Sequence, residues 1–193
     1  MPRQTRGLFV PGLLLAGILT LGCGGSQPPP AAAPPAAPAP APMAATPFGV
    51  PGLRCPPARP AAEVELPDDT PVVGVAVKGK ARAYLLSALS KMTQHIVNDV
   101  VSETPVTVTY CDRTDCLCAF TADTPGKPLA VETGGWQGKM IIRVGQTFYW
   151  QDTGEPINPG AAKAFPYTPF PHERTTWKAW KQAHPETDIF TGM

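Results

Sequence analysis

The chain has 193 residues, of which 43% are hydrophobic and only 16% are charged. Its 26 prolines are about 13% of the sequence, against roughly 5% in ordinary proteins, so segments of different character have to be separated. The formal net charge of +1 and the isoelectric point near 7.6 argue against a nucleic-acid-binding protein.

The N-terminal segment is predicted to be a signal peptide of the lipoprotein type, residues 1–22. Two arginines precede a 15-residue, mostly apolar run at residues 7–21, which is shorter than the ~20 residues that span a bilayer as a helix. The run ends at Gly22-Cys23 and resembles a bacterial lipobox, although Thr20 stands where that pattern prefers leucine. An ordinary signal cut near Gly25, or an uncleaved anchor, is the alternative interpretation.

Lipidation at Cys23 would attach the mature protein to a membrane through its acyl chains. We therefore expect an exported protein anchored to the cell envelope, at the periplasmic face or the outer membrane.

Residues 23–60 are then predicted to be a disordered linker rich in proline and alanine. Residues 27–60 hold 13 of the 26 prolines, which remove amide donors and stop helices and strand ladders.

Residues 61–193 are predicted to form a single globular domain of the α+β class. Runs rich in β-branched residues, bounded by turn residues, predict a mainly antiparallel sheet. The segment 175–183 has helical composition and is stopped by His184-Pro185, and a short helical turn is expected within 85–92. The fold class is thus an antiparallel β-sheet with short peripheral helices. The expected strands are 71–78, 81–86, 94–101, 105–111, 116–121, 140–144 and 147–151.

Three of the remaining cysteines are crowded in the pattern C-x₄-C-x-C, at Cys111, Cys116 and Cys118. Because side chains alternate along a strand, Cys116 and Cys118 are expected on one face, and a four-residue loop can bring Cys111 beside them. A structural disulfide, a site for a soft metal ion such as copper or zinc, a redox-active dithiol and buried free thiols all fit this pattern. A disulfide from Cys55 to one of the three is a further alternative.

Several motifs together resemble the family known as domain of unknown function (DUF) 3179. The resemblance covers roughly residues 68–190 and implies no activity, because the family is uncharacterised. The departure lies in the cysteine loop, where the family pattern C-P-x-C is replaced by the longer spacing. The matching motifs are Ala83-Tyr84, His95 with Asn98-Asp99, Val108 to Cys111, Tyr149 to Gly154, Trp177 with Trp180, and His184-Pro185 with Thr187.

His95 is a candidate further ligand, since imidazole and thiolate together suit copper or zinc; a histidine bonded to a backbone carbonyl is the competing interpretation. Asn98, Asp99 and Tyr110 are candidate supports for the cysteine cluster.

The sequence has no G-x-S-x-G, H-E-x-x-H or P-loop motif, so a binding module is favoured over an enzyme. We expect a membrane-tethered soft-metal or thiol-redox module; a non-catalytic structural or binding module with a structural disulfide is the alternative.

Overall fold

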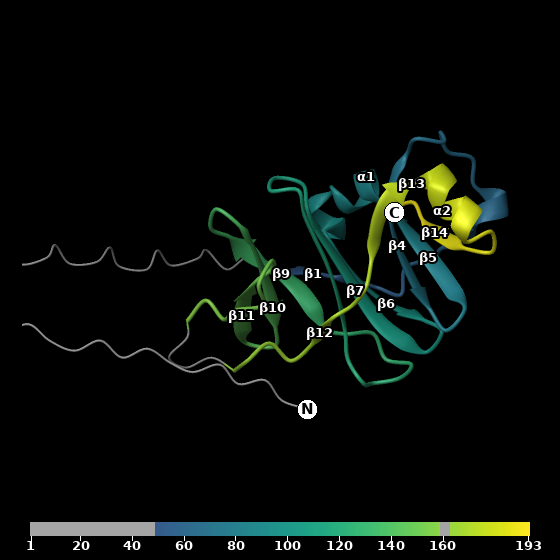
Figure 1. Cartoon of the computed structure of the whole chain (residues 1–193). Helices are drawn as coiled ribbons and strands as arrows, with labels where there is room; N and C mark the ends of the chain where they lie inside the picture. Colours follow the sequence, from purple (N-terminus) through teal and green to yellow (C-terminus); the bar gives the residue numbers. More distant parts are fainter. Residues whose placement is uncertain (1–48, 159–162) are drawn as a thin grey trace, which may run out of the picture. The chain divides into compact units, whose positions relative to one another are not determined.

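The computed structural model describes residues 49–158 and 163–193, whose strands form three sheets (Figure 1). The first sheet has the order β1-β9-β10-β11, with β1 Val50–Pro51, β9 Val131–Trp136, β10 Met140–Val144 and β11 Thr147–Trp150. We call it sheet A. Sheet B has the order β12-β8-β7-β6-β2, with β12 Thr168–Pro169, β8 Cys116–Thr121, β7 Thr104–Cys111, β6 Ile96–Val101 and β2 Leu53–Arg54.

Sheet C has the order β13-β4-β5-β14-β3, with β13 Glu173–Thr176, β4 Pro71–Val77, β5 Lys80–Leu85, β14 Asp188–Phe190 and β3 Arg59–Pro60. The helical elements are short: α1 Leu86–Leu89, α2 Trp177–Ala183, and the 3₁₀ turns η1 Ala61–Glu63 and η2 Met92–Gln94. Most strand pairs are antiparallel; β2 with β6 and β14 with β5 are parallel. The predicted fold class is confirmed.

Sheet B supplies side chains to two separate cores. Alternate residues of β7, namely Val106, Val108 and Tyr110, pack in one cluster with Val73 and Tyr84 of sheet C. The residue that ends β7, Cys111, belongs to a second cluster with side chains of sheet A such as Ile142. Figure 1 accordingly shows the green strands β9 to β11 on one side of β7 and the blue strands β4 and β5 on the other. The two-residue period of a strand thus decides which core each side chain enters.

A third cluster covers the other face of sheet C, where Trp177 and Trp180 of α2 pack on Val72 and Ile189. The helix begins at a Thr176 N-cap, whose side-chain oxygen accepts from the Ala179 amide. It ends at His184-Pro185, as the sequence predicts.

The folded region begins before the predicted boundary at residue 61. Strands β1, β2 and β3 lie within residues 50–60, and they pair with β9, β6 and β14 respectively. Each of these strands is only two residues long, so the prolines of this segment fit at the sheet edges without interrupting a ladder. The predicted signal peptide, Cys23 and the linker up to residue 48 lie outside the described residues.

Candidate functional site

The β7–β8 hairpin places three thiols on the face of sheet B that meets sheet A. Its four-residue loop is closed by Asp115, which adopts a left-handed backbone with φ of 52°. The Asp115 Oδ1 accepts hydrogen bonds from the Tyr110 hydroxyl and from Arg174 Nη1, both at 2.8 Å. Hydrogen bonds from these two donors, of which Arg174 has the larger effect, lower the pKa of the Asp115 carboxyl. A negatively charged acceptor therefore holds the loop in place.

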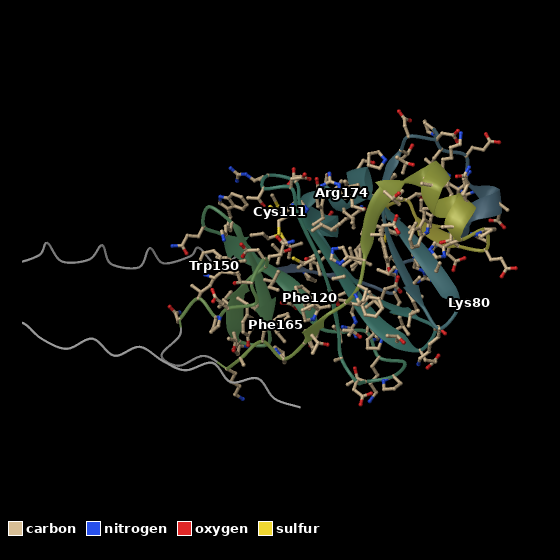
Figure 2. The ribbon with its side chains drawn as sticks, viewed as in Figure 1. Lys80, Cys111, Phe120, Trp150, Phe165 and Arg174 are labelled. Atoms are coloured by element: carbon tan, nitrogen blue, oxygen red, sulfur yellow. The ribbon has the colours of Figure 1, made fainter. Side chains whose placement is uncertain are left out.

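Cys111 and Cys116 lie directly opposite each other in the antiparallel ladder, and Cys116 Sγ is 3.9 Å from Cys118 Sγ. Cys111 is buried, whereas Cys116 and Cys118 are partly exposed. Figure 2 labels Cys111 where the hairpin meets the green strands of sheet A. The structure therefore brings together the three sulfurs that the sequence pattern singles out.

Both thiols of the close pair favour their protonated form. Burial is the largest cause, and it raises the pKa of Cys118 to about 12, with the neighbouring Cys116 sulfur adding to the shift. Burial also raises the pKa of Cys116 above its ordinary value. Because the thiolate is the nucleophile and the metal ligand, these cysteines must lose a proton before they attack a disulfide or bind a metal.

Gln151 ties the cysteine hairpin to sheet A. Its buried Nε2 donates to Thr109 Oγ1 at 3.0 Å and to the Cys116 carbonyl at 3.2 Å. Beside it, a cavity of about 160 Å³ is lined by Cys116, Lys139 and Asp152, among other residues. Lys139 Nζ pairs with Asp152 Oδ2 at 2.5 Å, so one positive and one negative group stand next to the Cys116 thiol.

The loop residue Arg113 packs its guanidinium 4.2 Å from the centre of the Trp136 ring of β9. Residues of the β7–β8 hairpin and of the β9–β10 hairpin therefore line the cysteine site together. Sequence reasoning missed Gln151, Lys139 and Asp152 as site residues. The sequence did offer a hint, because Tyr149 to Gly154 is one of the family motifs. The position of this motif beside the cysteines, however, depends on how the sheets pack.

The His95 ring has partners other than the sulfurs. Its Nδ1 is 2.7 Å from the Leu89 carbonyl oxygen, and its Nε2 is 3.6 Å from Asp112 Oδ1. The Tyr110 amide donates to the His95 carbonyl, and Tyr110 packs in the core shared with sheet C, on the opposite face from Cys111. The competing interpretation of His95, a histidine bonded to a backbone carbonyl, describes this geometry. Neither His95 nor the Tyr110 ring contacts the thiols in the way the sequence analysis expected.

Asn98 and Asp99 join sheet B to its two neighbours instead of supporting the cysteines. The Asn98 side chain bonds Val131 of sheet A through its amide, with Nδ2 donating to the carbonyl and Oδ1 accepting from the N–H. Asp99 Oδ2 accepts from Arg82 Nη1 at 2.8 Å and from the Tyr84 hydroxyl at 2.9 Å, both in sheet C. Burial and the Asp99 charge raise the pKa of Tyr84 well above its usual value.

Cys55 is separated from the other sulfurs by a whole strand. It follows β2, and its amide donates to the Asn98 carbonyl of β6, so β6 lies between Cys55 and β7. Two strand spacings amount to about 9.6 Å, beyond the roughly 7 Å limit between the Cα atoms of a disulfide. The alternative of a disulfide from Cys55 to this cluster is therefore excluded by the register, and Cys55, Cys111, Cys116 and Cys118 are all free thiols.

Within residues 49–158 and 163–193, no group of three or more His, Cys, Asp or Glu side chains is arranged to hold a metal ion. The predicted ligand set of three sulfurs with His95 is thus not assembled; the close pair is Cys116 with Cys118. The same residues contain no helix that is both long enough and apolar enough to cross a bilayer.

Fold and site together define a β-rich domain with a thiol cluster between two of its sheets. The chain belongs to the DUF3179 family of proteins of unknown function, whose model matches residues 48–192. This match begins two residues before the first described strand, which starts at Val50. A search of curated proteins and a search of solved structures found no match.

Proposed function

We propose that the domain binds a soft cation, Cu(I), through the thiolates of Cys116 and Cys118. The observation that carries this proposal is the 3.9 Å separation of their sulfurs. With metal–sulfur bonds of about 2.3 Å, two thiolates in a tetrahedral or trigonal arrangement stand roughly 3.8–4.0 Å apart. The metal therefore fits between the sulfurs with little movement of β8.

The number of ligands favours Cu(I) over Zn²⁺. Structural zinc sites are almost always closed by four protein ligands, and the described residues supply two close sulfurs. Soft thiolate ligands select Cu(I), which accepts low coordination numbers. The cavity beside Cys116 leaves room for a donor from another molecule, as suits a protein that receives and releases the ion.

The test is a titration of the fully reduced, metal-free protein with Cu(I) against a competing chelator. Cys55→Ser is the matched control, because Cys55 is exposed and follows β2, which lies three strands along sheet B from β8. We expect wild type and Cys55→Ser to bind one equivalent with equal affinity, and Cys116→Ser and Cys118→Ser each to lose at least tenfold. Equal, weak binding in all four proteins would contradict the proposal.

We further propose that the protein is exported and attached to the cell envelope by acylation of Cys23. The support is the sequence: two arginines, an apolar run and Gly22-Cys23. Cys23→Ser should release the protein from the membrane fraction into the soluble fraction. A variant that stays membrane-bound and unprocessed would contradict lipidation as the attachment and show that the apolar run acts as a plain anchor.

A further inference from the structure

Cys116 has two different sulfur neighbours, and their backbone geometries suit different chemistry. Directly opposed residues of an antiparallel pair, such as Cys111 and Cys116, have Cα atoms about 4.5–5.5 Å apart. Cys116 and Cys118 are two apart on one strand, which places their Cα atoms about 6.6–6.8 Å apart. Disulfides span roughly 4.4–6.8 Å, so the cross-strand pair lies inside this range and the same-strand pair at its upper end.

We propose that Cys116 is a thiol–disulfide exchange site for low-molecular-weight disulfides, with Cys111 as the resolving thiol. The product is a disulfide between Cys111 and Cys116. The exchange does not depend on metal binding. Its consequence does rest on the proposed function, because the disulfide removes Cys116 from the pair of thiols that binds Cu(I). Oxidation of the domain would then release the metal.

The exchange proceeds in two balanced displacements. The Cys116 thiolate attacks one sulfur of the small disulfide, forms a mixed disulfide, and expels a small thiolate that takes up the proton lost by Cys116. The Cys111 thiolate then attacks the Cys116 sulfur and expels the second small thiolate, which takes up the proton lost by Cys111. Two protein thiols are oxidised to one disulfide, and one small disulfide is reduced to two small thiols.

The order of attack follows from access to the two sulfurs. Cys116 is partly exposed and lines the cavity of about 160 Å³, while Cys111 is 2% exposed and lies within the core shared with sheet A. A small disulfide therefore meets Cys116 first. Lys139 and Asp152, both exposed, stand at the same cavity, and they suit the carboxylate and ammonium groups of an aminothiol.

The reagent is cystine, applied to the metal-free reduced protein, with disulfides mapped by mass spectrometry of peptides. In wild type we expect the Cys111–Cys116 disulfide, whose formation releases two cysteines, and a separate mixed disulfide at exposed Cys55, whose formation releases one. In Cys111→Ala, where the buried site keeps an apolar side chain, a mixed disulfide should accumulate at Cys116. A disulfide between Cys116 and Cys118, or modification confined to exposed Cys55, would overturn the proposal; the wild-type map decides this even if a variant fails to fold.

Two variants separate this proposal from the proposed function. Cys118→Ser should lose Cu(I) binding and still form the Cys111–Cys116 disulfide. Cys111→Ala should keep Cu(I) binding within about threefold and lose that disulfide. If reduced wild type fails to bind Cu(I) but forms the disulfide, metal binding fails and the exchange stands; if it binds Cu(I) but forms no Cys111–Cys116 disulfide, the reverse holds.

Discussion

Asn98 of β6 and Val131 of β9 are joined across two sheets by a pair of hydrogen bonds that imitates a strand ladder. Asn98 Nδ2 donates to the Val131 carbonyl at 2.9 Å, and the Val131 amide donates to Asn98 Oδ1 at 3.1 Å. Thr107 Oγ1 donates to the same Oδ1 at 2.8 Å. One buried side chain thus satisfies three groups and fixes the position of sheet A, which carries Lys139 and Gln151, on sheet B.

Asn98→Ala should be strongly destabilising. It leaves the Val131 amide, the Val131 carbonyl and the Thr107 hydroxyl buried without this partner, at about 1–3 kcal/mol each, so we expect a loss of at least ~3 kcal/mol in the free energy of unfolding. Chemical denaturation measures it. Thr107→Val is the matched control and should cost about 1 kcal/mol, because the amide pair remains. Equal losses in the two variants would contradict the ladder role of Asn98.

Removing Arg82 should destabilise the domain more than removing the Tyr84 hydroxyl. Asp99 is 1% exposed and accepts from both, so Arg82→Leu leaves a buried carboxylate without its cation, at about 3–5 kcal/mol. Tyr84→Phe removes one hydrogen bond to a charged group, at about 1.5–3 kcal/mol.

The double variant Arg82→Leu, Asp99→Leu is the control for that comparison. Since it removes both charges, it should recover much of the stability lost in Arg82→Leu, as measured by the same unfolding midpoints. No recovery would show that packing of the Arg82 stem, and not the stranded carboxylate, sets the cost.

Gly74→Ala should destabilise the packing of α2 on sheet C. A Cβ at this position would stand 2.3 Å from ring carbons of Trp180, which is itself held by a hydrogen bond from Nε1 to Thr187 Oγ1. Overpacking of this kind costs about 1–3 kcal/mol. Adding Trp180→Leu to Gly74→Ala should make the alanine nearly neutral relative to Trp180→Leu alone, as judged by thermal unfolding.

Cu(I) affinity should rise steeply with pH. Both thiols must lose a proton to bind the metal, and the raised pKa of Cys116 and the pKa of Cys118 near 12 keep them protonated throughout the neutral range. Below pH 9 the affinity should therefore increase about 100-fold per pH unit, two protons being released. Competition titrations at pH 6, 7 and 8 measure this slope, and a flat profile would show that these two thiolates are not the ligands.

The local part of the fold could be predicted from the sequence. The β-branched runs predicted β4 to β8, and the strand period predicted that Cys116 and Cys118 share a face. Strand β9 was missed because its Gly134-Gly135 weakens the strand pattern, and β1 to β3 because prolines predict an interrupted chain.

The wider site could not be predicted, because it depends on register and on packing between sheets. His95 was expected near the sulfurs, but it precedes β6 and opposes Tyr110, which faces the other core. Likewise, nothing local to Gln151 indicates that it meets Cys116; their contact is created when the β10–β11 hairpin packs on sheet B.

Strand β14 lies between β5 and β3, so sheet C is built from segments at both ends of the folded region. Asp188 pairs with Pro60 on one side and with Arg82 on the other, the former across about 130 residues of chain. Contacts between residues this far apart in the sequence form late and slow folding, because the chain loses the entropy of closing the loop before the contacts stabilise the fold. During synthesis from the N-terminus, Phe190 has to emerge before this sheet can close. Sheet C therefore stays incomplete until β14 has left the ribosome, and until then the β5 edge that β14 covers has no strand partner on that side.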